Sequence, residues 1–332
     1  MAGLDAGQPP TFRAAINMVE VDALAVDRRG EVVADLRQEE FEILEDGKPQ
    51  RIASFQFVNI PLPSAGDRAP SRREADDVYG NDGEAGRLLV LVLDDLHTAP
   101  FRAARVRSLA NRFIGRMGAN DLMAIVSTSG ARAASQEFTK DRAALEHAVA
   151  QFTPSKDPVN AMNPEASRGF AAQKSVAMLK TLRDVAAHLA GVQHRRKTVL
   201  FISEGVDIDL MPSMEDPHDV AANATSNSTS RDAAKGSGTA EDWGFMARTA
   251  LENLLRAAQR ANVAIYPLDP RGLVAPGEDD GSPTVMNDFL RTIAENSGGR
   301  AVVATNQTTE GLDRIIRESS SYYLIAYESP SG

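Results

Sequence analysis

Two carboxylates, an imidazole and a hydroxyl come directly after one continuous apolar run. The run is Leu88 to Leu93, and it is followed by Asp94, Asp95, His97 and Thr98. A short apolar run without alternation is typical of a strand that is covered on both faces. Such a strand would carry oxygen ligands to the edge of a sheet, which is where open α/β sheets bind their ligands.

A second polar group follows the apolar run Thr198 to Ile202. It begins with Ser203 and Glu204, and Asp207 and Asp209 come shortly after. We expect these two aspartates to add negative potential at the same edge, or to be solvated loop charges. His97 is expected to hydrogen-bond a carboxylate or to shape the ligand surface, and a solvent-facing loop histidine is the simpler alternative.

The elements that would position these residues alternate along the chain. Beyond residue 87, short apolar runs are separated by segments with apolar residues at helical spacing. The runs that we predict as strands are Leu88 to Leu93, Leu122 to Val126, Thr198 to Ile202, Val263 to Leu268 and Ala301 to Ala304. Pro100 is expected to open the first helix. This alternation predicts an α/β fold with a doubly wound, mostly parallel sheet and helices on both faces.

A small β unit is expected at residues 11–60, where strand-like runs are separated by turns such as Asp46-Gly47. About fifty residues make a thin core. We therefore expect the terminal run Ser321 to Tyr327 to pair with this unit, so that residues 320–330 complete a β-sandwich-like unit. Residues 61–86, which are rich in proline, glycine and charge, are predicted to be a linker to an α/β domain at 87–319.

Two polar insertions interrupt the α/β pattern. They extend from Pro154 to Gly169 and from Asp207 to Asp242. Both leave from the ends of strands or helices near the predicted edge. We expect mobile loops there, and they are candidates for contact with a partner.

The composition excludes several classes of protein. The chain has 332 residues, a formal net charge of -10 and no cysteine. The acidic balance argues against nucleic-acid binding, and the lack of cysteine excludes disulfides and thiolate metal sites. No apolar run approaches the roughly 20 residues that span a bilayer, so direct membrane insertion is not expected. The first residues lack the basic and apolar regions of a signal peptide.

In the order of these pieces, the chain resembles the von Willebrand factor A (VWFA) domain family. The resemblance is closest to bacterial VWFA-related proteins described first from acidobacteria, and it spans residues 11–330. The segments that carry it are Asp94 to Thr98, Phe201 to Gly205, the N-terminal run Phe41-Glu42-Ile43-Leu44-Glu45-Asp46-Gly47, and the terminal Ser321-Tyr322-Tyr323-Leu324-Ile325-Ala326-Tyr327.

The resemblance implies a metal-ion-dependent adhesion site for a divalent cation such as Mg²⁺, Mn²⁺ or Ca²⁺. Family members build it from Asp-x-Ser-x-Ser, a threonine on a middle loop and Thr-Asp-Gly. The ligands implied in this chain are Asp94, Thr98 and Glu204, with Asp95 and Thr153 as further candidates. The site is degenerate, because Leu96 replaces a serine and Ser203-Glu204-Gly205 replaces Thr-Asp-Gly. A vestigial, metal-free version of the site is the alternative.

The function that the resemblance implies is a protein-binding or adhesion module. A partner's acidic side chain would complete the coordination of the ion, with His97, Asp207 and Asp209 near the contact. The native protein is expected to be secreted, or periplasmic or otherwise in the cell envelope, with a cytoplasmic location as the alternative. Metal-free recognition by the long loops is a second hypothesis. A Mg²⁺-dependent hydrolase at the same edge is a third, although the chain contains no phosphate-binding loop and no nucleophile elbow, and we do not expect an enzyme.

Overall fold

A computed structural model of the protein describes residues 18–60, 86–156, 164–192, 195–207, 240–274 and 282–329. The chain divides into two compact units. One unit comprises Met1–Val58 together with Ser321–Gly332, and the other comprises Asn59–Ser320. The predicted linker lies outside the described residues except for Gly86.

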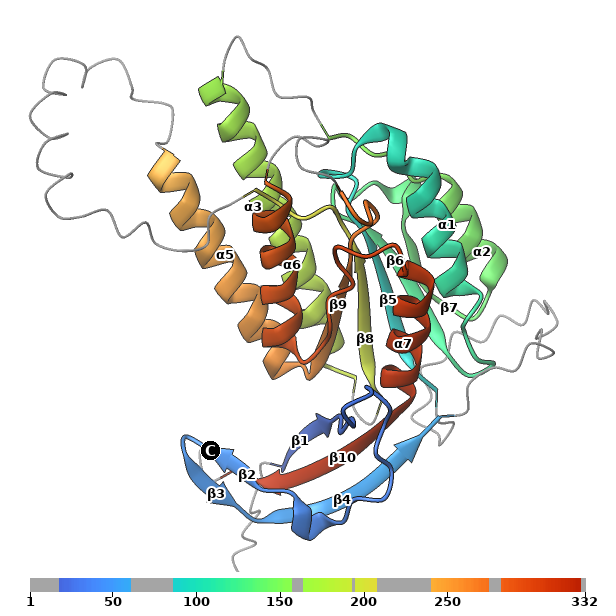
Figure 1. Ribbon diagram of the computed structural model, residues 1–332, viewed down its shortest axis with the longest axis vertical. Helices are drawn as coiled ribbons and strands as arrows, with labels where there is room; N and C mark the ends of the chain where they lie inside the picture. Colours follow the sequence, from blue (N-terminus) through green and yellow to red (C-terminus); the bar gives the residue numbers. More distant parts are fainter. Residues whose placement is uncertain are drawn as a thin grey trace, which may run out of the picture. The chain divides into compact units, whose positions relative to one another are not determined.

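The larger unit contains a five-stranded sheet in the order β7-β6-β5-β8-β9 (Figure 1). Four of its strands are parallel, namely β5 (Leu88–Leu93), β6 (Leu122–Ser127), β8 (Lys197–Ile202) and β9 (Val263–Leu268). β7 (Gln136–Thr139) runs antiparallel to β6. The predicted α/β class with a mostly parallel sheet is confirmed, and the edge strand β7 was not predicted.

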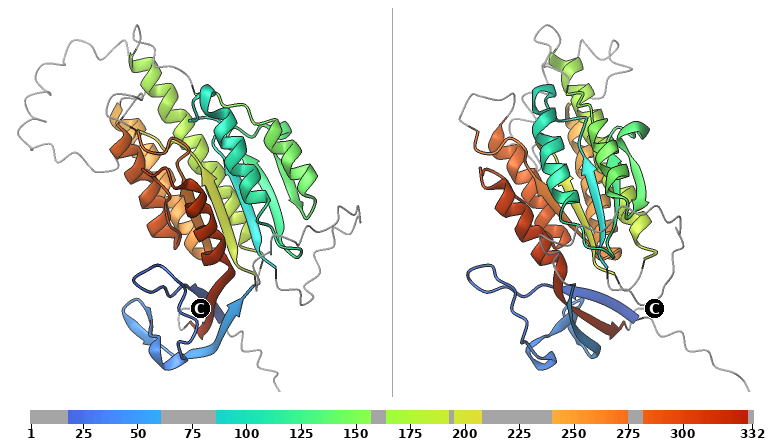
Figure 2. Two further views of the ribbon diagram at one scale, coloured as in Figure 1. Left: turned by 45° about the vertical axis from the view of Figure 1, so that its right-hand side comes forward. Right: turned by 90° about the vertical axis from the view of Figure 1, so that its right-hand side faces the viewer.

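Two separate cores cover the two faces of this sheet, and β5 contributes to both. Leu89, Leu91 and Leu93 lie in one core, whereas Leu88, Val90 and Val92 lie in the other. The first face is covered by α1 (Ala103–Ile114), α2 (Arg142–Ala150) and α7 (Thr308–Ser320), and the second by α3 (Pro164–Leu189), α5 (Ala240–Arg260) and α6 (Pro283–Ser297). Helices on both faces explain why the strand is a continuous apolar run (Figure 2).

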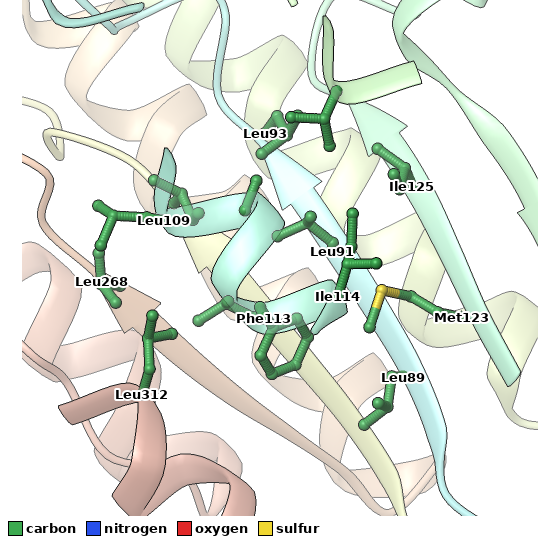
Figure 3. Packing of buried hydrophobic residues seen from close by; sticks show 14 of the residues in the cluster. Leu89, Leu91, Leu93, Leu109, Phe113, Ile114, Met123, Ile125, Leu268 and Leu312 are labelled. Carbon is green, nitrogen blue, oxygen red and sulfur yellow. The ribbon is translucent and has the colours of Figure 1, made fainter. Parts of the chain in front are cut away.

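Figure 3 shows the first of these cores. Phe113 and Leu109 of α1 and Leu312 of α7 lie among Leu91 of β5 and Leu268 of β9. All of these side chains are at most 4% exposed. The sheet is therefore held between tightly packed helices, and its carboxyl edge is presented from a rigid support.

Several boundaries differ from the prediction. Pro100 opens the 3-10 turn η2 (Pro100–Arg102), and α1 begins directly after this turn, at Ala103. The strand predicted at Ala301 to Ala304 is a single bridge between Val302 and Leu268, because Ala304 adopts a left-handed conformation with φ 52° that ends the extended run. A further short turn, η3 (Arg132–Ala134), precedes β7.

The two polar insertions are partly helical. α3 begins at Pro164, a favourable first residue for a helix, and α5 begins at Ala240. The last residues of both predicted loops, 164–169 and 240–242, are therefore helical. Residues 157–163 and 208–239 lie outside the described part of the chain.

The smaller unit contains a three-stranded sheet in the order β1-β10-β4. The strands are β1 (Met18–Ala23), β10 (Ser321–Glu328) and β4 (Ile52–Asn59), and β1 pairs antiparallel with β10. The terminal strand thus lies between two N-terminal strands.

Turns and aromatic rings complete this unit. A hairpin joins β2 (Ile43–Glu45) to β3 (Lys48–Gln50), and the short turn η1 (Gln38–Glu40) precedes it. The rings of Phe41, Phe55 and Phe57 lie 5.0–5.3 Å from the ring of Tyr323. The run from Glu31 to Leu36, within the β unit expected at residues 11–60, contributes a single isolated bridge, between Val32 and Val26.

None of the helices in the described ranges is long and apolar enough to cross a membrane.

Candidate functional site

The carboxyl ends of three neighbouring strands bring polar side chains together. Asp94 follows β5, Thr128 follows β6 and Ser203 follows β8. The backbone N–H of Asp94 donates to the carbonyl of Ile202 at 3.0 Å, and that of Thr128 donates to the carbonyl of Leu93 at 3.1 Å. The loops thus leave the sheet in fixed directions, and their first side chains converge, as expected for this edge.

The Asp94 carboxylate is fully buried, and protein donors surround it. Nδ1 of His97 lies 3.0 Å from both carboxylate oxygens. The Thr128 hydroxyl donates to Oδ1 at 2.8 Å, and the Ser203 hydroxyl donates to Oδ2 at 2.6 Å. Both oxygens therefore have internal partners.

These contacts determine the charge of Asp94. Burial is the largest single influence and by itself raises the pKa of the carboxyl group. The attraction of His97 and the hydrogen bonds from His97, Ser203 and Thr128 together outweigh it, so the pKa lies below its ordinary value of 3.8. Asp94 is therefore an anion at neutral pH that the protein itself stabilises.

His97 connects this carboxylate to helix α3. It is 9% exposed, so the solvent-facing alternative is wrong, and its Nε2 lies 3.2 Å from the Ser175 hydroxyl. Asp, His and Ser in this order resemble the relay of a serine hydrolase. Ser175 is only 3% exposed inside α3, however, and its hydroxyl also lies 2.9 Å from the carbonyl of Ala171. The contact links the loop after β5 to α3.

Asp95 faces the loop after β6. Its Oδ1 accepts a hydrogen bond from the backbone N–H of Ser129 at 2.9 Å, and the Ser129 hydroxyl donates to Oδ2. The Thr128 hydroxyl also lies 2.9 Å from Oδ1 of Asp95, so its single proton is shared between Asp94 and Asp95. The backbone carbonyl of Asp95 accepts from the N–H of Ser155 at 2.6 Å. Asp95 thus holds two neighbouring loops together.

Glu204 reaches inward, but it meets cations of the protein. Its side chain is completely buried. Oε1 accepts from the backbone N–H of Ala99 at 2.8 Å and lies 3.2 Å from Nη1 of Arg102, and Oε2 lies 3.1 Å from Nζ of Lys156. The carboxylate thus fixes the segment that enters η2.

A fourth acid lies at the end of β9. Asp269 is 1% exposed and pairs with Arg271 at 2.8 Å. Burial outweighs this partner and raises the pKa of Asp269, and the nearby charge of Glu204 adds to the increase. The sequence offers no periodic signal for this pair. Its position directly after a predicted strand is the only clue.

The other predicted site residues have hydrogen bonds of their own where the structure describes them. Thr98 is buried and its hydroxyl donates to the backbone carbonyl of Asp94, whereas Thr153 is exposed and bonds the carbonyl of Gln151 at 3.3 Å. Asp207 accepts a hydrogen bond from the N–H of Ser282 at 3.3 Å. Asp209 lies outside the described residues.

These residues do not fit a resident divalent cation. Within the described ranges, no three His, Asp or Glu side chains come together in a way that could hold a metal ion. A hard cation needs several free oxygen ligands. The oxygens of Asp94 already accept from protein donors, and the ammonium of Lys156 and the guanidinium of Arg102 lie where an ion bound to Glu204 would be repelled.

A hollow of about 330 Å³ lies beside this network. It is lined by Leu96, Thr128, Ser129, Phe170, Gln173, Lys174 and Ala177. Leu96, which occupies the position of a serine in the family pattern, forms part of its wall. Sequence reasoning missed Thr128 and Ser129, although Ser127-Thr128-Ser129 directly follows a predicted strand and could have indicated them.

No protein-family model and no curated protein matches the chain. Among solved structures, the vWF domain of the type V pili tip protein Mfa5 from Porphyromonas gingivalis is 14% identical, with 70% of this chain and 95% of that chain covered and a TM-score of 0.43. The manganese-loaded Plasmodium vivax TRAP protein is 11% identical, with 74% and 79% covered and a TM-score of 0.38. An aerotolerance-related membrane protein from Bacteroides fragilis is 12% identical, with 70% and 98% covered and a TM-score of 0.35. The order of the sheet described above rests on the strand pairing of this chain and not on these likenesses.

Proposed function

We propose that this chain is a protein-binding module of the adhesion type that recognises its partner at the carboxyl edge of the five-stranded sheet without a resident metal ion. The observation that carries the proposal is the internal neutralisation of the edge. Asp94 is satisfied by His97 and two hydroxyls, and Glu204 by Lys156 and Arg102. The positive charge that a metal ion would supply next to these carboxylates comes from the protein itself.

The hydrogen bonds also pre-organise the surface around the edge. Thr128 bridges Asp94 and Asp95, which ties the loop after β6 to the loop after β5. His97 ties the loop after β5 to α3 through Ser175. Loops that are ordered before binding lose less conformational entropy when a partner arrives, which favours affinity.

The hollow beside the network supplies the contact surface of the proposal. Its wall combines the apolar Leu96 and Phe170 with the polar Gln173 and Lys174. Phe170 is 64% exposed, as is typical of an anchor that becomes buried on binding. The proposal also includes that the native protein is exported and that the predicted loops at residues 154–169 and 207–242 contact the partner.

Filling the hollow tests the location of the site. Ala177 lines the hollow, whereas Ala187 lies on the same helix, is also exposed and does not line it. The immobilised protein is incubated with surface proteins from its source, with chelator or with Mg²⁺. We expect one captured species, identical in both buffers, that Ala177→Trp loses and Ala187→Trp retains. The proposed site would be rejected if both variants capture the species, or if the wild-type protein captures nothing in either buffer.

Calorimetry tests the absence of a resident metal. Mg²⁺, Mn²⁺ and Ca²⁺ are titrated into chelator-treated protein, and the melting temperature is measured in parallel, because an ion that binds the native state must raise it. We expect no saturable heat and no thermal shift. Saturable binding that Asp94→Ala and Glu204→Ala both abolish would instead support the metal-dependent adhesion site, with Thr98 and the candidates Asp95 and Thr153 completing its ligands.

The Mg²⁺-dependent hydrolase is the less favoured alternative for the same edge. It would need Asp94 to hold the ion, and the three donors around its carboxylate oppose that role. Turnover of a generic phosphate ester that disappears in Asp94→Ala would favour the enzyme. Partner capture without turnover supports the binding module.

A further inference from the structure

A groove of about 190 Å³ lies between α3 and α5 and carries large exposed apolar side chains. Figures 1 and 2 both show these helices side by side. Val176 of α3 and Ala250 of α5 line the groove, together with Phe245 and Met246. Phe245 is 66% exposed and Met246 is 45% exposed. Two such side chains next to one another in a groove are typical of an interaction surface.

The charged side chains that line the groove are basic, and Thr249 and Asn253 are its neutral polar ones. Lys180 and Arg183 both lie along it, one turn apart on α3. Arg183 is already paired with Asp184 at 2.6 Å, and that pair is largely exposed to solvent. A partner with negative charge would therefore meet the ammonium of Lys180 and a guanidinium that retains further donors.

Over their full ranges the two helices carry seven basic and five acidic residues, whereas the chain as a whole is acidic. Their described side chains include six basic and two acidic ones, namely Lys174, Lys180, Arg183, Arg248, Arg256 and Arg260 against Asp184 and Glu252. The whole chain has a formal net charge of -10. A basic apolar groove favours a partner segment of opposite charge and disfavours a symmetric contact with the same groove of a second copy.

We infer that this groove docks an acidic amphipathic segment of a partner protein. Its apolar residues would cover Phe245 and Met246, and its carboxylates would face Lys180 and Arg183. An amphipathic helix presents its anchors at i, i+3, i+4 and i+7, which suits a groove between two parallel ridges of side chains. No lining residue of this groove also lines the hollow at the sheet edge, so the two surfaces are separate.

A labelled peptide tests the docking surface directly. The probe has leucine at i, i+3, i+4 and i+7 and glutamate on its other face, and its binding to the full chain is followed by fluorescence anisotropy. One control peptide replaces the glutamates by lysines, and another replaces the leucines by serines. We expect saturable binding of the acidic peptide only, and weaker binding as salt rises.

Matched variants locate the contact on the protein. Phe245→Ser is expected to weaken the binding by about tenfold or more, whereas Leu273→Ser, at a similarly exposed leucine away from the groove, leaves it unchanged. Lys180→Glu weakens it severalfold, and Arg260→Glu, which changes the net charge equally at the end of α5, has a much smaller effect. All four positions are on the surface, so circular dichroism should show an unchanged fold.

Three results would overturn the inference. The first is equal binding of the acidic and basic peptides, and the second is an unchanged peptide affinity in Phe245→Ser. The third is that no peptide binds, whereas vesicles of phosphatidylserine and phosphatidylcholine bind in a way that depends on Phe245. The last result would identify an anionic lipid surface as the occupant. The Ala177→Trp variant, which fills the hollow at the sheet edge, is expected to bind the acidic peptide normally.

Discussion

Asp94 is an anion in the interior of the protein, and its donors come from three different elements. Replacing it by asparagine keeps the shape of the side chain but removes the charge and one acceptor, because an amide nitrogen then faces His97, Thr128 or Ser203. Hydrogen bonds to a buried charge stabilise by about 1.5–3 kcal/mol. We therefore expect Asp94→Asn to lower the free energy of unfolding by about 3 kcal/mol in a urea titration.

The matched control for that substitution is Asp184→Asn. The side chain of Asp184 is 65% exposed and pairs with Arg183 at the surface. Surface pairs of this kind contribute little to stability. Equal losses in Asp94→Asn and Asp184→Asn would contradict the central role of the Asp94 network.

The lowered pKa of Asp94 predicts how this contribution depends on pH. In the folded protein its pKa lies below the unfolded value of 3.8, so the native state releases the proton more readily. The stabilisation is therefore fully present above the unfolded pKa and is lost as the pH falls through the folded pKa. The difference in unfolding free energy between wild type and Asp94→Asn should shrink as the pH falls below about 4. A difference that grows below pH 4 would show that the sign is wrong.

Gly205, directly after Glu204, has a conformation and a neighbourhood that exclude a side chain. Its φ is +80°, and a Cβ there would lie 2.6 Å from the backbone carbonyl oxygen of Met286. Gly130 has a similar φ of +75°, but nothing lies within 4 Å of its Cβ position. Gly130→Ala should lower the free energy of unfolding by about 1 kcal/mol, which is the cost of the backbone strain alone. We expect Gly205→Ala to cost at least about 3 kcal/mol, since backbone must move, and urea unfolding of both variants compares the two costs.

Among the elements, α3 is tied to the sheet edge by polar contacts, one from Thr181 to the carbonyl of Thr128 and one between Ser175 and His97. Nε2 of His97 lies 3.2 Å from the Ser175 hydroxyl, in the N-terminal half of the helix. Loss of one hydrogen bond worth about 1 kcal/mol should speed local opening roughly fivefold. We expect His97→Ala to accelerate amide hydrogen exchange near Ser175, with exchange in α5 unchanged. His188→Ala, at an exposed position of the same helix, should leave both helices unaffected.

The sequence predicted the elements whose side chains follow a regular pattern of burial. β5 and β9 begin and end at the predicted residues, because helices on both faces require every side chain of these strands to be apolar. β7 has the sequence Gln-Glu-Phe-Thr and lies at the edge of the sheet, where only Phe138 packs against a core. One apolar residue among polar ones carries no periodic signal, and the strand was therefore not predicted.

The site was predicted only as far as it follows from strand ends. Asp94 and Glu204 could be placed at the edge because each comes directly after an apolar strand. Their surroundings could not be placed, because Lys156 meets Glu204, and Ser175 meets His97, only through tertiary packing. Whether an ion or a protein cation neutralises a carboxylate depends on such distant residues, which no local pattern contains.

On the scale of the whole molecule, the smaller unit is assembled from both ends of the described chain. β10 lies between β1 and β4, and Tyr323 forms the centre of its aromatic cluster. The Tyr323 hydroxyl also donates to the carbonyl of Val33 at 2.9 Å and accepts from the N–H of Leu36 at 3.0 Å. Folding of this unit therefore depends on a contact between segments separated by almost the entire larger unit, and its loop-closure entropy is correspondingly high.

The larger unit, in contrast, has its own two cores and should fold without that contact. A chain that ends at Ser320 lacks the middle strand of the smaller sheet, and we expect its residues 18–58 to be cut rapidly by trypsin while the described strands and helices of the larger unit stay resistant. Tyr323→Ala in the full chain should weaken the smaller unit alone, by about 3 kcal/mol or more for the loss of a buried aromatic ring. Met18→Ala, at a half-exposed position of β1, serves as its control. Protection of residues 18–58 in the shortened chain would show that the N-terminal strands fold without β10, whereas loss of protection throughout would show that the two units unfold as one.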